Sequence, residues 1–301
     1  TVFRVELFKG KSHFGENVTF DETLPTNYLA DEVIDDNKVN ELLAKKYNET
    51  IVIAEDDSEI LAYLKDELST NFRVIAVNNG YDAVKAVMDD EVSLILSDVL
   101  MPALNGFQLC SNIKSNIATC HIPIVLLTAL SDDNQRIYGI AEGADEYIHK
   151  PFNMQYVRLK IIRIIEERKR LASTFAQKFG RLTRHEAANL PCVDDVFRDK
   201  LFNLIEAQHS DSNFKIELMS DMLGMSRILL YRKITSIFGM SPSDLLRNYR
   251  LQKAVQLLTD QRRNVSEVAY IVGFSSPAYF AKCFKSVYNM TPTEYMYRTR
   301  E

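Results

Sequence analysis

The chain has 301 residues, of which 46% are hydrophobic and 26% charged, an ordinary globular balance that predicts about two domains. No apolar run approaches the roughly 18 residues of a membrane helix, and no signal peptide opens the sequence, so we expect a soluble piece of protein. Its four cysteines form no CxxC pair and its five histidines show no metal-ligand spacing. This pattern predicts neither a disulfide framework nor a zinc site, and it favours a reducing cytoplasm.

The net charge of −5 conceals two oppositely charged halves. Residues 49–152 carry 6 Lys and Arg against 17 Asp and Glu, a net charge of −11. Residues 196–301 carry 15 Lys and Arg against 10 Asp and Glu, a net charge of +5. An acidic half suits a bound cation and a basic half suits phosphate groups, so the two halves are expected to do different work.

The first 48 residues contain one short strand pattern and little else. In TVFRVELFKGKSHF, residues 1–14, apolar and polar side chains alternate as in a half-buried strand, but no partner strand follows before Ile51. We therefore expect a fragment of a longer chain; the alternative is a strand added to the edge of a later domain. The acidic stretch 15–48, interrupted by Pro25, predicts a linker with at most a short helix near 39–45.

From Ile51 onward, short apolar runs alternate with amphipathic segments. The runs are residues 51–54, 72–77, 93–97, 123–128 and 146–149. Strands this apolar, with helices between them, predict an α/β fold with a doubly wound, five-stranded parallel sheet covered on both faces. Ligands of such sheets bind beyond the carboxyl ends of the strands.

Polar side chains stand at those carboxyl ends. They are Glu55, Asp56 and Asp57 after the first strand, Asp98 ending the third, Thr128 ending the fourth and Lys150 after the fifth. Clustered carboxylates repel one another, so the group predicts a bound cation such as Mg²⁺. Taken singly, Asp98 could form a turn, Lys150 could be a solvated charge, and Thr128 could be a core residue. The whole set meeting at one edge favours a site, with Asp57 or Ser58 set aside as the N-cap of the next helix.

Four segments carry a family resemblance: IVIAEDD, LILSDVLMPALNGF, IVLLTAL and GADEYIHKPF. In order and spacing they resemble the signature segments of two-component response-regulator receiver domains, and the match predicts such a domain over residues 49–171. The resemblance implies that Asp98 accepts a phosphoryl group from a phosphohistidine, assisted by Lys150 and Thr128. It implies that Mg²⁺ is held by Glu55, Asp56, Asp98 and the backbone carbonyl of Leu100. Thr128 and Tyr147 would be the pair that reorients on phosphorylation.

A long helix is predicted after Lys150. Its apolar seam, with one charged member, is Val157, Ile161, Ile164, Arg168, Leu171 and Phe175, spaced alternately by four and three residues. We expect its first half to pack on the sheet. Beyond Arg168 the seam could pair two chains, and residues 172–195 are predicted to form a helical linker.

The basic half contains two similar units, FKIELMSDMLGMSRILLYRKITSIFGMSP from Phe214 and NVSEVAYIVGFSSPAYFAKCFKSVYNMTP from Asn264. Each has an apolar helix, a glycine for the turn (Gly224, Gly273), a capping serine (Ser226, Ser276) and a second helix with basic residues on one side. This is helix-turn-helix spacing, which predicts two helices that enter major grooves about 34 Å apart.

The region 196–301 resembles the AraC-type DNA-binding domain, and VGFSSPAYFAKCFKSVYNMTPTEY is especially similar to that family's second unit. The resemblance implies that base edges face Ile228, Tyr231 and Arg232 in the first helix and Pro277, Ala278, Ala281 and Lys282 in the second. Arg227, Lys233 and Lys285 are expected to contact phosphates. Apolar side chains can contact thymine methyls, and Arg232 can bind guanine. Leu229, Leu230, Phe280, Phe284 and Val287 are predicted core residues.

Together these segments resemble the cytoplasmic end of a hybrid two-component protein, with residues 1–14 similar to the last strand of a histidine kinase's ATP-binding domain. The implied partners are promoter DNA, a kinase domain on the same parent chain, a second copy in the active state, and RNA polymerase. The fragment would have no enzymatic activity beyond phosphoryl transfer to itself and its reversal, while the anchored parent would be a phosphotransferase in the inner membrane. Two alternatives stay open: a free-standing response regulator, and an interaction module in which Asp98 is never phosphorylated.

Overall fold

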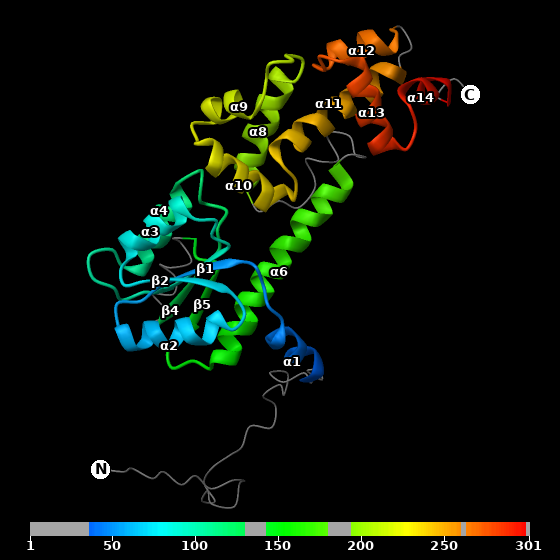
Figure 1. Cartoon of the computed structure of the whole chain (residues 1–301). Helices are drawn as coiled ribbons and strands as arrows, with labels where there is room; N and C mark the ends of the chain where they lie inside the picture. Colours follow the sequence, from blue (N-terminus) through cyan, green and yellow to red (C-terminus); the bar gives the residue numbers. More distant parts are fainter. Residues whose placement is uncertain (1–35, 130–142, 180–193, 260–262, 299–301) are drawn as a thin grey trace, which may run out of the picture. The chain divides into compact units, whose positions relative to one another are not determined.

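The computed structural model describes residues 36–129, 143–179, 194–259 and 263–298 (Figure 1). The strand expected at 1–14 and most of the linker lie outside these residues. Helix α1 (Asp36–Ala44) occurs where a short helix was expected. Among the described residues, no helix has both the length and the apolar character required to cross a membrane.

The predicted parallel sheet is confirmed. Its strands are β1 (Thr50–Ala54), β2 (Arg73–Val77), β3 (Leu94–Asp98), β4 (Ile124–Thr128) and β5 (Glu146–His149). They pair in the order β2-β1-β3-β4-β5, and every pair is parallel. The strand order changes direction between β1 and β3, so the carboxyl ends of these two strands border the crevice where doubly wound sheets bind ligands.

Two apolar cores lie on opposite faces of the sheet. The first is covered by α2 (Ser58–Ser69) and the amino-terminal half of α6 (Met154–Phe179), the second by α3 (Gly80–Asp89) and α4 (Gly106–Ser115). Because side chains alternate along a strand, Ile51 and Ile53 enter the first core, while Val52 and Ala54 enter the second. Burial on both faces explains why these strands are almost wholly apolar.

Helix α6 runs without a break past residue 171, the predicted end of the receiver domain. Val157 and Ile161 are fully buried on the sheet, as expected. Phe175, by contrast, is buried in an aromatic cluster of the basic half, with its ring 4.8 Å from that of Phe238. The interpretation of this seam as a surface for a second chain is therefore wrong at Phe175, because its own chain already covers it.

The basic half is helical, as predicted. Its helices are α8 (Asp195–Gln208), α9 (Ile216–Leu223), α10 (Arg227–Phe238), α11 (Pro242–Thr259), α12 (Val265–Ile271), α13 (Pro277–Tyr288) and α14 (Pro292–Arg298). They enclose two cores, one around α8 to α10 and one around α12 to α14. Helix α11 supplies Leu245 and Tyr249 to the first core and Leu251 and Leu258 to the second, so it joins the two units.

The turns of both units are built as the sequence predicts. Gly224 and Gly273 adopt φ values of 67° and 88°, a conformation that favours glycine. The hydroxyl of Ser226 accepts the backbone N–H of Leu229, and Ser276 caps α13 in the same way. The helices α10 and α13 thus begin at equivalent N-caps.

Candidate functional site

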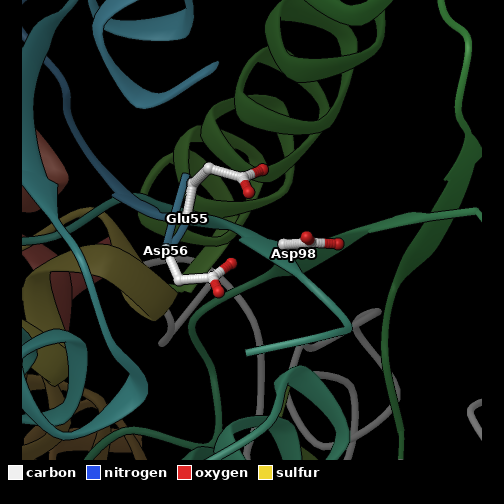
Figure 2. A group of neighbouring side chains, drawn as sticks. All are labelled: Glu55, Asp56 and Asp98. Atoms are coloured by element: carbon white, nitrogen blue, oxygen red, sulfur yellow. The ribbon is translucent and has the colours of Figure 1, made fainter. Parts of the chain in front are cut away.

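Three carboxylates meet at the carboxyl edge of the sheet. Glu55 and Asp56 follow β1 and Asp98 ends β3, as Figure 2 shows. One oxygen from each lies within 4.8 Å of the others. Glu55 is 1% exposed and Asp98 7%, whereas Asp56 is exposed to solvent. The juxtaposition predicted from the strand ends is therefore present in the structure.

Lys150 is the cation of this cluster. Its Nζ lies 2.9 Å from Oε2 of Glu55 and 3.0 Å from Oδ2 of Asp98. Burial raises the pKa of Glu55, against the opposing effect of the hydrogen bond from Lys150. Burial disfavours the charged ammonium, but its hydrogen bonds to Glu55 and Asp98 raise the pKa of Lys150 above its ordinary value. Lys150 is therefore charged at neutral pH.

The charge balance of the cluster fits a divalent cation. Three carboxyl groups surround one ammonium, so acidic groups outnumber basic groups in the cluster. A small hard cation with oxygen ligands, such as Mg²⁺, would balance the excess of acidic groups and keep open positions for water or phosphate oxygens. The partly solvent-facing arrangement around Asp56 leaves room for those ligands. Glu55, Asp56 and Asp98 are the side chains that would hold the ion.

Close backbone packing positions Asp98. The N–H of Val99 donates to Oδ1 of Asp98 at 2.7 Å. Gly106, at the start of α4, lies so near that a Cβ there would be 2.4 Å from the carbonyl oxygen of Asp98. Any side chain at Gly106 would thus displace the backbone of Asp98, a role of Gly106 that sequence reasoning missed. The glycine that ends the run DVLMPALNG could have revealed this constraint, because only glycine, which has no Cβ, allows two backbone segments to come so close.

The remaining predicted residues of this site surround the cluster. Thr128 is 6% exposed and follows Leu127, the residue of β4 that pairs with Asp98. Tyr147 is half-buried on β5. Leu100 is 57% exposed and lies two residues after Asp98. Their roles as switch pair and carbonyl ligand stay predictions.

Most of the predicted DNA-contacting side chains lie at the surface of their two helices. The exposed ones are Arg227, Ile228, Tyr231, Ala278, Lys282 and Lys285, and the half-buried ones are Arg232, Pro277 and Ala281. The expected core residues Leu230, Phe280 and Phe284 are fully buried, while Leu229 and Val287 are partly buried against the two cores. The two helices therefore offer polar and apolar groups to a partner.

Lys233 is the exception, and the prediction that it contacts a phosphate is wrong for this structure. The residue is 0% exposed, and its Nζ lies 2.6 Å from Oδ2 of Asp194. Lys233 stands between Leu230 and Ile237 on the buried face of α10. The matching position of α13 is the buried Cys283, and comparing the two units would have revealed the assignment.

Each half of the chain matches the model of a known protein family. Residues 51–162 match the family model described as a response regulator receiver domain. Residues 219–298 match the model described as a helix-turn-helix domain. The chain therefore carries a receiver domain followed by an AraC-type helix-turn-helix domain.

The chain is also similar to particular proteins, over all or part of its length. The chain is 35% identical over 313 residues to histidine kinase P4 of Formosa agariphila, an alignment that covers 100% of this chain and 22% of the relative. It is 38% identical over 113 residues to the transcriptional regulatory protein GltR of Pseudomonas aeruginosa, covering 37% of this chain and 47% of the relative. The chain thus spans less than half the length of either relative.

Among solved structures, the signal receiver domain of a signal transduction histidine kinase from Syntrophus aciditrophicus is 34% identical. That alignment covers 40% of this chain and 93% of the solved chain, with a TM-score of 0.39.

Proposed function

We propose that this chain is a phosphorylation-controlled DNA-binding regulator of transcription. Asp98 accepts a phosphoryl group from a histidine kinase, and the helix-turn-helix units bind promoter DNA. The observation that carries the proposal is the carboxylate of Asp98, held 3.0 Å from Lys150 in an acidic cluster. The same chain presents two helices, α10 and α13, that begin at serine N-caps and carry exposed polar and apolar side chains.

The chemistry follows from the geometry of the cluster. An oxygen of Asp98 attacks the phosphorus of a phosphohistidine; the new O–P bond forms as the P–N bond breaks, and the imidazole leaves with the electron pair and takes a proton. Lys150 neutralises charge on the transferring group. Bound Mg²⁺ would supply further positive charge for the phosphoryl oxygens. The hydroxyl of Thr128 donates a hydrogen bond to a phosphoryl oxygen. Tyr147 changes its side-chain orientation when Thr128 moves.

The DNA-binding role divides the exposed side chains into two sets. Arg227 and Lys285 contact phosphates, which position the domain without specifying sequence. The base-reading set is Ile228, Tyr231, Arg232, Pro277, Ala278, Ala281 and Lys282. Arg232 pairs with guanine, and the small apolar side chains contact thymine methyls.

We propose further that the chain is the output end of a longer hybrid kinase. The whole of this chain aligns within 22% of a relative named as a histidine kinase, which leaves most of that relative outside the alignment. In this proposal, residues 1–14 end the kinase's ATP-binding domain, 15–48 and 172–195 are linkers, and 49–171 and 196–301 are the two output domains. The parent is anchored in the inner membrane with this part in the cytoplasm. The active form is a dimer that contacts RNA polymerase.

A free-standing response regulator is the second candidate, favoured by the alignment to GltR, which is named as a transcriptional regulatory protein. The gene distinguishes the two, because a hybrid protein requires kinase and membrane segments upstream in the same reading frame. An interaction module with an unphosphorylated Asp98 is the third candidate.

Labelling with radioactive acetyl phosphate tests the phosphoacceptor assignment. The wild-type chain should take up label only with Mg²⁺, and Asp98→Asn should take up none. Asp90→Asn, which changes an acid outside the cluster, is the matched control and should label normally. Label retained by Asp98→Asn would refute the assignment and favour the interaction module.

A further inference from the structure

Helix α10 is attached to the receiver domain through Arg232. The guanidinium donates to three successive carbonyl oxygens, those of Met88 at 3.4 Å, Asp89 at 2.8 Å and Asp90 at 2.9 Å. These carbonyls lie at the carboxyl end of α3, where the last carbonyls of a helix lack partners within it. An arginine there satisfies them and complements the negative end of the helix dipole.

Lys233 fastens the same helix to a second receiver segment. Its ammonium donates to the carbonyl of Ile117 and lies 3.2 Å from the thiol sulfur of Cys120. Both residues lie between α4 and β4. The charge is balanced by Asp194, the N-cap of α8, to which the Cys120 thiol also donates at 2.9 Å. A buried ammonium with this set of partners holds α10 in one position.

An apolar contact completes the docking. Ala118, a receiver residue that is 6% exposed, belongs to the same apolar cluster as Leu230 and Phe238 of α10. All the receiver groups in this contact precede β3 or β4 and therefore lie at the amino edge of the sheet. Asp98 lies at the opposite edge, so substitutions at this contact leave the phosphoacceptor cluster intact.

The contact is incompletely paired. A cavity of about 350 Å³ is lined by receiver, α6 and α10 residues, including Glu49, His121 and Thr235. Oε2 of Glu49, Nδ1 of His121 and Oγ1 of Thr235 are buried without a hydrogen-bond partner among the described residues. The cavity shows that the receiver domain and α10 are not closely packed along this border. An incompletely packed interface loses fewer contacts when its two sides separate.

Arg232 cannot contact the receiver domain and DNA at the same time. One guanidinium cannot cap α3 and bind a guanine edge at the same time. A major groove about 12 Å wide admits a helix but not a helix with a domain fixed along one flank. Helix α13 has no hydrogen bond or ion pair to the receiver domain among the described residues, so it stays available to DNA.

We propose that the amino edge of the receiver sheet is a docking surface for α10, and that docking excludes binding of a full operator. The docked chain binds only the half-site read by α13, and release of α10 adds the second half-site. This proposal rests on the proposed DNA-binding function.

The first test breaks the contact with Ala118→Glu. A buried carboxylate at this apolar position should expel α10, while Ala62→Glu places the same charge on the exposed face of α2 as a matched control. Alkylation of Cys120 by iodoacetamide, followed by mass spectrometry of its peptide, reports undocking without DNA. We expect about a tenfold faster reaction in Ala118→Glu than in wild type or Ala62→Glu, because undocking exposes the thiol and relieves its burial. Equal rates in all three would overturn the docking surface.

The second test measures binding to duplexes selected from a random-sequence library, with the full chain and no phosphoryl analogue. Ala118→Glu should bind a full site about tenfold more tightly than wild type, despite its added negative charge, and should bind the α13 half-site equally well. Faster Cys120 alkylation with unchanged full-site affinity would overturn the exclusion while leaving DNA binding intact. Failure of every chain to select DNA would instead refute the proposed function.

A reciprocal test needs no substitution and therefore no assumption about folding. If DNA and the receiver compete for α10, a saturating full-site duplex should speed Cys120 alkylation in the wild-type chain, and the α13 half-site should not. Equal acceleration by both duplexes, or by neither, would contradict the competition.

Discussion

The two helix-turn-helix units share one architecture but differ in what surrounds their second helices. Helices α10 and α13 both have 12 residues and serine N-caps, so Arg232 corresponds to Lys282 and Lys233 to Cys283. In α10, Arg232 donates to the carbonyls at the end of α3, and Lys233 forms an ion pair with Asp194. In α13, Lys282 is exposed to solvent and Cys283 is part of the apolar core. The same motif therefore contacts the receiver domain in the first unit and, in the function we propose, reads DNA unobstructed in the second.

Lys233→Ala should have the largest effect of the changes that test this difference. It leaves the partly buried carboxylate of Asp194 without its main cation, which we expect to lower the free energy of unfolding of the DNA-binding half by about 3–5 kcal/mol. Lys282→Ala, at an exposed position, should change it by no more than about 0.5 kcal/mol. Urea unfolding followed by circular dichroism measures both. Similar values for the two variants would show that Lys233 is not a structural ion pair.

The turn glycines offer a second matched pair. A Cβ on Gly273 would lie 2.1 Å from the carbonyl oxygen of His209, whereas a Cβ on Gly224 would meet nothing within 4 Å. Gly273→Ala should therefore cost about 3 kcal/mol or more, from positive φ and backbone collision together. Gly224→Ala should cost only the conformational part, about 1–2 kcal/mol. Thermal unfolding of the two variants checks the ranking, and a reversed order would contradict this account of the turns.

Lys282→Ala should weaken DNA binding by about 1–3 kcal/mol if the ammonium contacts a base. Lys285→Ala should instead weaken binding to all sequences alike and reduce the salt slope by about one, because a phosphate contact releases one counterion. Fluorescence anisotropy over a range of salt concentrations separates the two. An unchanged affinity for the selected site in Lys282→Ala would count against the placement of α13 in the groove.

Arg232→Ala should have the smallest effect, below about 1 kcal/mol on full-site affinity. The loss of a guanine contact is offset by the loss of the contact that holds α10 on the receiver. In an Ala118→Glu background the offset is gone, and the same substitution should cost about 1–3 kcal/mol. Binding isotherms for the four chains of this cycle give the coupling energy. Equal costs in both backgrounds would show that Arg232 has no role in docking.

The sequence predicted those features that depend on local pattern. The five strands begin and end within one residue of the apolar runs, and the acids at their ends meet as parallel strands require. The serine caps and turn glycines were likewise visible, because each acts on backbone within a few residues of its own position. These features follow from periodicity and from the chemistry of single residues.

The missed features depend on contacts between distant segments. No local sequence pattern predicts that Arg232 donates to carbonyls about 140 positions earlier in the chain. Nor does one predict that Lys233 forms an ion pair with Asp194. Gly106 was missed for a related reason, since its constraint comes from the backbone of Asp98 across a loop. Lys233 could have been recognised from its place on the apolar face of α10. Its positive charge favoured the phosphate interpretation instead.

The most direct test of the central claim is the affinity of the chain for a selected full-site duplex with and without beryllofluoride and Mg²⁺, in which beryllofluoride stands for the phosphoryl group on Asp98. The account predicts tighter binding with beryllofluoride, a gain that Asp98→Ala abolishes. Equal binding with and without beryllofluoride, in a chain shown to bind the analogue, would contradict control of DNA binding by phosphorylation of Asp98.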